Sequence, residues 1–482
     1  MRVSEYYGLN KTQPELDFLD VDVDRDIKLF IDPVALSLSK SDLAMECSAL
    51  VQDYFGLLLE TVNENKRTRG IRMMSRLSEP NETHLGLSAN QSEGRGLGPV
   101  TAAAFWDALR DSDARSSGLI KDIQDTAVLV ENIGPDIVSD ITTNIIRGPL
   151  LRYTEEMSNL YGIQLFDDIS SGFVWDAETG QWTQYYTRRP MANGRPILLV
   201  PKIFVRKRHS YQVDEYYRWC VLDYLADVEM SSTQKSSLVQ RRKNGDPYVN
   251  KKDLRAKYGE GKPKAIKYTI ATPSIYDDYK RKKQQKPLEA MPHEDIASAI
   301  DDDVPDYDEL YAKLASIDPG RNEASAYEDA ILGLLSALFY PALSEPECQV
   351  NLNQGRKRVD ITFMNTASPS TDFFNWVRNE HPAGRILIEC KNYSSDISNP
   401  EIDQLVGRFS DLRGKVGIIV SRRSDNKNAI LQRCRDAALH RQGFVIYLDD
   451  EDLKTLVDER KQEETCTSLH GLLRRRYDEL VL

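Results

Sequence analysis

The sequence predicts a multidomain α/β protein, with a mixed α/β core at the C-terminus and an α+β region of unknown fold before it. The chain has 482 residues, a length that suggests two to four domains of about 150 residues each. Its charge pattern turns basic and then acidic between residues 211 and 306, which predicts a connecting region there. We therefore expect an N-terminal domain over 1–210, a helical and basic connecting region with an acidic linker over 211–306, and a C-terminal domain over 307–482.

The first region combines helix-like and strand-like segments. Residues 42–62 (DLAMECSALVQDYFGLLLETV) place apolar side chains at helical spacing and predict a helix. Residues 195–205 (RPILLVPKIFV) are mostly apolar and predict a strand, which Pro201 could interrupt because proline cannot donate to a strand ladder.

A denser segment lies at residues 132–156, where Gly134 and the proline after it form a turn. Isoleucines then fall at helical intervals, and polar side chains fall beside them: Asp136, Asp140, Thr143 and Asn144. This pattern predicts an amphipathic helix with a polar outer face. A face that senses a ligand or contacts a partner would give the same pattern, so both interpretations stay open.

The connecting region begins with a predicted helix over 213–230 and then becomes strongly basic. Between residues 240 and 286, basic side chains outnumber acidic ones by about three to one. Tyrosines are interleaved with them: Tyr248, Tyr258, Tyr268, Tyr276 and Tyr279. Such a segment could follow a phosphate backbone with tyrosines available for stacking, or it could be a solvated linker. Residues 291–310 turn acidic and predict the linker into the last region.

The last region alternates helix and strand patterns. We expect a helix at 325–339, strands at 347–353, 358–364 and 385–391, a helix at 399–412, a strand at 415–421, a helix at 425–441, a strand at 443–449 and a helix at 450–460. The strand at 415–421 is apolar throughout, which is typical of a buried parallel strand. Pro400 near the start of its helix fits a helix N-terminus.

Two strands of this region carry charges where apolar residues would be expected. Glu389 and Lys391 end the strand 385–391 and point to the same face, because alternate side chains of a strand share a face. Asp360 lies in the neighbouring predicted strand. A buried ion pair would explain Glu389 and Lys391, but a second acid leaves surplus negative charge that suits a bound cation.

Asp360 followed by Glu389-Cys390-Lys391 resembles the D…ExK signature of the PD-(D/E)xK, restriction-endonuclease-like nucleases. The segments "GRKRVDITF" and "IECKNY" most resemble the Mrr-like branch. The resemblance covers the last third of the chain and implies a restriction-endonuclease-like mixed α/β core there. Two features depart from the pattern: "NTASPSTDFFNWVRNEHPAG" lengthens the connection between the two acids, and Arg408 stands where many RecB-like relatives have a tyrosine.

The resemblance implies a metal-dependent phosphodiester hydrolase. Asp360, Glu389 and the backbone carbonyl of Cys390 are expected to bind Mg²⁺, with Mn²⁺ as a substitute, since Mg²⁺ prefers oxygen ligands and keeps several waters. Lys391 is expected to position the attacking water or to stabilise the transition state. Glu328 is expected to bind a second metal or to orient a metal-bound water, and Gln404 to support the lysine or the attacking water. Arg356, Arg358 and Arg408 are expected to bind the nucleic acid.

The sequence thus predicts a Mg²⁺-dependent endonuclease acting on double-stranded DNA, controlled by its N-terminal region through a partner protein or signal. A role in restriction or antiviral defence follows by analogy only. The alternative is a non-catalytic protein whose nuclease-like domain binds nucleic acid or acts as a scaffold. One such active site cuts one strand, so double-strand breaks would need a homo-oligomer.

The composition fits a cytoplasmic protein with no membrane contact. No apolar run approaches the roughly 20 residues that span a bilayer. The six cysteines are scattered without a CxxC pair, so we expect reduced, mostly buried thiols and neither a zinc site nor a disulfide framework.

Overall fold

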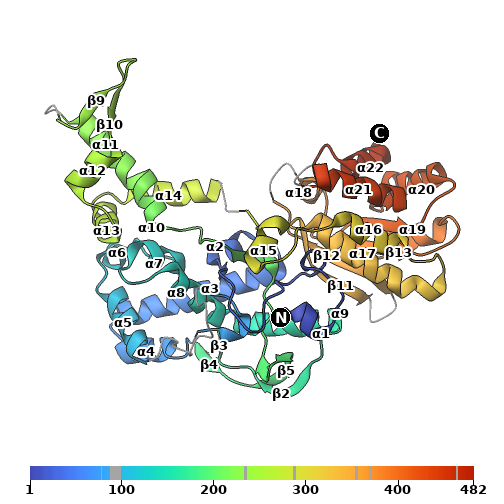
Figure 1. Cartoon of the computed structure of the whole chain (residues 1–482), viewed down its shortest axis with the longest axis horizontal. Coiled ribbons are helices and arrows are strands. Elements are labelled where there is room, and N and C mark those ends of the chain that lie inside the picture. The colour runs from blue at the N-terminus through green and yellow to red at the C-terminus, as the bar shows by residue number, and fades with distance from the viewer. Residues whose placement is uncertain are drawn as a thin grey trace.

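The computed structural model describes residues 1–77, 79–86, 99–232, 236–285, 289–352, 357–368, 372–462 and 465–482. It is a mixed α/β structure, as the sequence predicts. Figure 1 shows the N-terminal and C-terminal parts side by side and a helical arm that projects away from both.

The N-terminal part is mainly helical, with small two-stranded sheets. Its helices are α1 (Val3–Tyr7), α2 (Pro33–Leu38), α3 (Asp42–Asn63), α4 (Arg67–Met74), α5 (Pro99–Arg110), α6 (Asp113–Ser116), α7 (Ile123–Leu129), α8 (Pro135–Ile145) and α9 (Arg147–Tyr161), with 3-10 turns η1 (Gln13–Glu15), η2 (Asn81–Thr83) and η3 (Lys202–Phe204). The antiparallel strand pairs are β1 (Phe30–Ile31) with β8 (Val205–Arg206), β2 (Phe166–Ser170) with β5 (Tyr186–Arg189), β3 (Val174–Asp176) with β4 (Gln181–Thr183), and β6 (Met191–Ala192) with β7 (Arg195–Pro196). Helix α3 confirms the helix predicted at 42–62.

The strand predicted over 195–205 is largely wrong. Strand β7 ends at Pro196, residues 197–200 belong to no strand, and the 3-10 turn η3 follows Pro201. The apolar residues of this segment are buried all the same, with Ile197, Leu198 and Leu199 each about 1% exposed. Burial in the core explains the apolar sequence here, and proline at two positions removes the donors that a continuous ladder would need.

Helix α8 confirms the helix predicted after Gly134, but only part of its polar face is solvent-exposed: Asp136 is exposed and Asp140 is half-buried. Thr143 and Asn144 are each only 2% exposed. The helix packs against α3, α7, α9, β1 and β3, so most of its circumference is covered. The threonine hydroxyl and the asparagine amide donate to backbone carbonyls one turn earlier, at Ser139 and Asp140, which satisfies them without solvent.

The connecting region forms the projecting arm. It contains α10 (Val213–Tyr216), a π-helical turn (Tyr217–Val221), α11 (Leu222–Ser231), the hairpin β9 (Val239–Arg241) and β10 (Pro247–Val249), α12 (Lys251–Tyr258), α13 (Lys262–Ala271) and α14 (Ser274–Gln285). The acidic segment predicted as a linker contains a further helix, α15 (His293–Ile300), so that prediction is wrong for these residues. His293 and Ile296 are nearly inaccessible, because the helix has an apolar face that packs into the core.

The C-terminal part is built on one five-stranded sheet in the order β11-β12-β13-β14-β15. The strands are β11 (Leu343–Leu352), β12 (Lys357–Asn365), β13 (Arg385–Lys391), β14 (Val416–Ser421) and β15 (Phe444–Leu448). β11, β12 and β13 pair antiparallel, whereas β13, β14 and β15 pair parallel. This confirms the predicted order of three strands followed by two helix–strand units, and the parallel pairing expected for the strand at 415–421.

Helices cover both faces of this sheet. α16 (Tyr307–Ala315), α17 (Ala324–Phe339) and α21 (Asp450–Gln462) pack on one face, and α19 (Asn399–Val406) and α20 (Lys427–Leu439) pack on the other. α18 (Phe373–Glu380) lies in the insertion between β12 and β13, and α22 (Leu472–Val481) packs beside β15. α19 is shorter than predicted, and its N-cap is Ser398.

The N-terminal and C-terminal parts of the structure meet at helix α17. One core runs from Val3 to Ile300 and includes Tyr340, and the others use residues from Tyr307 onward. The 3-10 turn η1 packs against α17, and Lys11 pairs with Asp329 of that helix at 3.0 Å. The N-terminal part is thus in direct contact with a helix of the C-terminal part.

All six cysteines are free thiols, and all except the partly exposed Cys348 are buried. This confirms the prediction that most of the thiols are buried. Within the described ranges, no helix combines the length and the apolar character that crossing a membrane requires.

Candidate active site

The acids predicted from the sequence meet where strands β12 and β13 stop pairing. The ladder pairs Ile361 with Ile388, so one step further places Asp360 beside Glu389. Asp360 then accepts a hydrogen bond from the backbone N–H of Cys390 at 2.9 Å. A side chain thereby replaces the ladder bond at this point, and the Asp360 carboxylate is fixed against β13.

Glu389 lies at the centre of the cluster, only 1% exposed. Its Oε1 accepts from Lys391 Nζ at 2.6 Å, and its other oxygen accepts from the guanidinium of Arg408, which follows α19. Burial, with the nearby charge of Asp360, still raises the pKa of Glu389 to about 7. Burial alone would lower the pKa of Lys391, but the charges of Glu389 and Asp360 outweigh it and raise that pKa.

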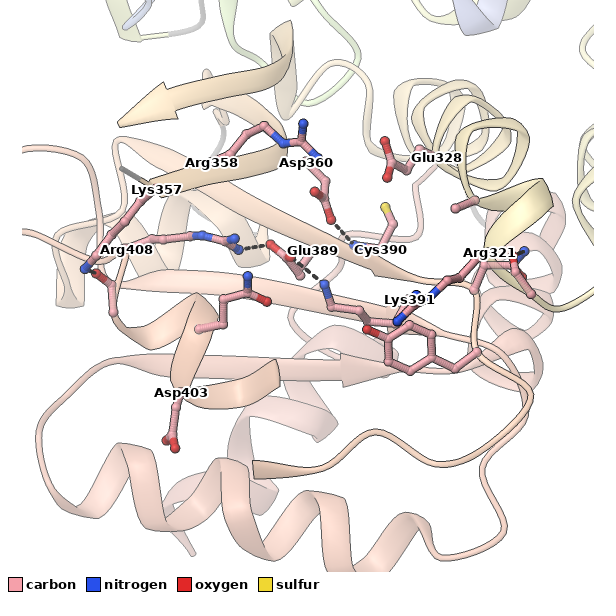
Figure 2. Close-up of a pocket in the computed structure, with 16 residues that line it drawn as sticks. Arg321, Glu328, Lys357, Arg358, Asp360, Glu389, Cys390, Lys391, Asp403 and Arg408 are labelled. Atoms are coloured by element: carbon pink, nitrogen blue, oxygen red, sulfur yellow. Dashed lines mark hydrogen bonds and ion pairs between the residues drawn. The ribbon is translucent and has the colours of Figure 1, made fainter. Parts of the chain in front are cut away.

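Glu328 faces this cluster from helix α17, as Figure 2 shows. Burial raises its pKa, and the charge of Asp360 adds to the effect. The side chain of Gln349 in β11 donates to its carboxylate. Three carboxylates from three different elements are therefore close enough for their charges to oppose one another.

The backbone after β13 is held against the loop that leads into α17. The side-chain amide of Asn392 donates to the carbonyls of Asp318 and Gly320 at 2.9 and 3.0 Å. In return, the Gly320 N–H donates to the backbone carbonyl of Asn392 at 2.8 Å. Among the described residues, the Asn392 side-chain oxygen is a buried acceptor without a hydrogen-bond partner. This polar atom is free to accept from a bound water or ligand.

These residues line one open pocket of about 590 Å³. Its walls contain Glu328, Asp360, Glu389, Cys390, Lys391, Gln404, Arg358 and Arg408, together with Gly320, Arg321, Ala324, Lys357, Asn392, Tyr393, Asp403 and Gly407. All the predicted catalytic and metal-binding residues are thus brought together. Arg356 lies outside the described residues.

Basic side chains surround the carboxylates. Arg358 and Lys357 are exposed on β12, and Arg321 is exposed at the opposite end of the pocket (Figure 2). Arg408 is expected from the sequence to bind nucleic acid, but it does not lie on the exposed rim. It is 4% exposed and paired with Glu389. Sequence reasoning did not single out Lys357 and Asn392, although both stand inside the quoted motifs, and no local signal marked Arg321.

The residues present fit a hard divalent cation by their chemistry. Mg²⁺ is usually held by one or two carboxylates and several waters, and the pocket offers Asp360, Glu389 and Glu328 as oxygen donors. Burial raises the pKa of both glutamates and the charge of Asp360 adds to the effect, so a cation bound here would favour their ionised forms. In the described part of the chain, no three ligand-type side chains stand together as a complete metal-binding group. Binding would therefore rely on waters and on release of Glu389 from its cationic neighbours.

Comparison with known proteins characterises only the N-terminal part. Residues 8–212 match a family model described as a domain of unknown function (DUF8370). No match was found among curated proteins or among solved structures.

Proposed function

We propose that this protein is a Mg²⁺-dependent endonuclease of the PD-(D/E)xK type, acting on double-stranded DNA. The observation that carries the proposal is the pocket in which Asp360, Glu389 and Glu328 crowd around Lys391 while exposed basic side chains line the rim. A centre rich in carboxylates suits a cation, and a basic rim suits a polyanion. A phosphodiester bound through a metal ion needs both.

In the proposed reaction, Asp360 and Glu389 would hold the cation, and the Cys390 carbonyl and Glu328 would be further ligands. When bound, Mg²⁺ would lower the pKa of a water and offset charge on the phosphate. Lys391 lies on the same strand face as Glu389 and can donate to the attacking water or to a phosphate oxygen. Arg358, Lys357 and Arg321 are placed to bind the neighbouring phosphates, and an arginine can do so with two parallel hydrogen bonds.

The contact between the N-terminal part and α17 offers a route for control. Lys11 pairs with Asp329, the neighbour of Glu328 on this helix, and Glu15 packs against Gly333 one turn later. A ligand or partner that shifts η1 would therefore act on the helix that carries one of the site carboxylates. Such control suits a nuclease of restriction or antiviral defence.

A second candidate is a non-catalytic nucleic-acid-binding or scaffold protein. The observation that favours it is the pairing of Glu389 with both Lys391 and Arg408, which satisfies this carboxylate without a metal. In that case the basic rim would still bind nucleic acid, but the carboxylates would serve only the fold.

The test is cleavage of a labelled linear DNA duplex by the full-length protein in Mg²⁺ and in EDTA. We expect metal-dependent cutting that Asp360→Asn, Glu389→Gln and Lys391→Met each reduce by about 10²-fold or more. Asp403→Asn is the matched control, because Asp403 lines the same pocket but points away from the other carboxylates (Figure 2). Duplex binding without cutting under all metal conditions would instead favour the second candidate.

A further inference from the structure

The arm formed by residues 213–232 and 236–285 is anchored at its base and free at its tip. At the base, Lys262 Nζ donates to the carbonyls of Ala127 and Ile133 at 2.7 Å each, and Tyr276 donates to Asp125 at 2.8 Å. α13 packs against α6 and α7. The hairpin β9–β10 lies at the far end of the arm (Figure 1). The base therefore holds the hairpin away from the two main cores.

The hairpin tip carries three consecutive cations. Arg241, Arg242 and Lys243 are all exposed, and none of them forms an ion pair with any described residue. The acid of the turn, Asp246, accepts from the side chain of Asn244 at 2.7 Å. The tip is thus a positive patch on a chain whose formal net charge is −12.

Several other cations of the arm are paired with acids, although Lys252, Lys264, Lys267 and Lys282 form no ion pair with a described residue. Lys257 pairs with Glu229, Arg281 with Asp278, and Lys283 with Glu215. Solvated helix faces commonly carry such weak surface pairs. The hairpin tip differs from the rest of the arm in placing three exposed cations without ion pairs next to one another, and this concentration of charge is the reason to expect a ligand there.

Aromatic rings hold the hairpin and its surroundings in shape. The Arg242 guanidinium lies 5.6 Å from the ring centre of Tyr248 on the opposite strand, and Tyr248 donates to Gln240 at 2.8 Å. Nearby on the π-helical turn, Trp219 is 53% exposed and has Lys251 Nζ 4.7 Å from its ring. Cations ordered in this way lose less conformational freedom on binding than flexible lysines in a linker.

We propose that the β9–β10 hairpin is a second nucleic-acid contact, which inserts into the major groove of double-stranded DNA and binds its phosphates. The B-form major groove admits a two-stranded β-ribbon, whereas the major groove of an A-form RNA duplex is too narrow and deep for side chains to read. The inference rests on the proposed function only in taking DNA as the ligand. The arm would then hold a duplex at a point remote from the site of cutting.

The test measures binding of a fluorescent 30-base-pair DNA duplex to the full-length protein in EDTA, across a series of salt concentrations. The test variant is Arg241→Gln/Arg242→Gln/Lys243→Gln. Glutamine at position 241 keeps a donor for the Gly245 carbonyl, to which Arg241 donates at 2.9 Å. The matched control, Lys66→Gln/Lys207→Gln/Lys313→Gln, removes the same charge from cations that pair with surface acids. Melting curves establish that each variant is folded.

Each phosphate contact contributes about 0.9 to the slope of log affinity against log salt. We expect the hairpin variant to lose about 2.7 of this slope and to bind about tenfold or more weakly at 100 mM salt, whereas the control keeps the wild-type slope. Equal slopes in the hairpin and control variants, or an absence of duplex binding by the wild type, would overturn the proposal. Equal loss of affinity for an RNA duplex of the same sequence would also overturn it, because the groove argument would fail.

The measurement is separate from the proposed hydrolysis. Asp360→Asn is expected to bind the duplex in EDTA with the wild-type slope. If this variant and the wild type bind alike but neither protein cuts DNA in Mg²⁺, the nuclease proposal fails and the hairpin contact stands.

Discussion

Replacing Asp360 with asparagine is expected to abolish cleavage and to stabilise the metal-free protein at the same time. Asparagine keeps an acceptor for the Cys390 N–H but removes one of three crowded negative charges. The pKa of Glu389 rises from its ordinary 4.5 to about 7, which corresponds to about 3 kcal/mol of unfavourable free energy on the ionised carboxylate. Burial contributes most of it and Asp360 comes second. The attraction of Asp360 for Lys391 offsets part of this second contribution, which leaves an expected gain of about 1 kcal/mol in the free energy of unfolding.

The assay is thermal melting of wild type and variant, first in EDTA and then in Mg²⁺. In EDTA the variant should melt about 2–4 °C higher, the shift typical of 1 kcal/mol in a domain of this size. In Mg²⁺ the wild type should gain about 1.4 kcal/mol when the metal is at ten times its dissociation constant, and the variant should gain much less. A variant that melts several degrees lower in EDTA would refute the reasoning, because it would show that Asp360 serves the fold.

Two further predictions concern the contact between the N-terminal part and the sheet domain. Burial, with the charge of Asp17 adding to it, raises the pKa of Glu345 to about 8, so the folded state keeps this proton while the unfolded state releases it above pH 4.5. The contribution of Glu345 to stability should therefore fall between about pH 4.5 and 8, and in denaturant titrations Glu345→Gln should remove on the order of 5 kcal/mol of that fall. An unchanged pH profile would contradict this. A Cβ at Gly333 would lie 2.7 Å from the Glu15 carboxylate, so Gly333→Ala should destabilise by about 1–2 kcal/mol. Gly56→Ala, in an open helical position, should stabilise by up to about 1 kcal/mol, and equal melting shifts for the two alanine variants would contradict the packing argument.

The C-terminal sheet could be predicted because its strands are short apolar runs bounded by clear turns. Strand β13 begins and ends at the predicted residues, and β14 differs from its prediction by one residue. The same criterion failed at 195–205, where residues 197–200 of an equally apolar segment are buried outside any strand. An apolar pattern indicates that a segment is buried, but it does not establish that the segment pairs in a sheet. At 195–205 the two prolines are what prevents a continuous strand.

The long insertion also hid a helix that the sequence could have revealed. Asp372 caps α18 by accepting from the backbone N–H groups of Phe374 and Asn375, and Phe373 and Val377 lie one turn apart on its buried side. Such a cap followed by apolar side chains four residues apart is a helix signal. The segment was expected only to lengthen the connection between Asp360 and Glu389, so its helix was not predicted.

The candidate site was predictable in its residues but not in all of their partners. Glu389 and Lys391 share a strand face because of the two-residue period of a strand, and the neighbouring strand supplies Asp360. The pairing of Arg408 with Glu389 depends on how α19 packs over the sheet, a tertiary feature with no local signature. Arg321 reaches the pocket from a loop that Asn392 holds in place, which likewise only the fold reveals.

The central claim is metal-dependent hydrolysis of DNA at this pocket. It is tested most directly by incubating supercoiled plasmid with the full-length protein in Mg²⁺, Mn²⁺ and EDTA, with Lys391→Ala purified alongside. The proposal predicts nicked or linear plasmid in both metals, intact plasmid in EDTA, and loss of cutting in the variant. Cutting that persists in Lys391→Ala or in EDTA would contradict the proposed site, and intact plasmid in both metals would contradict the proposed activity of the full-length chain.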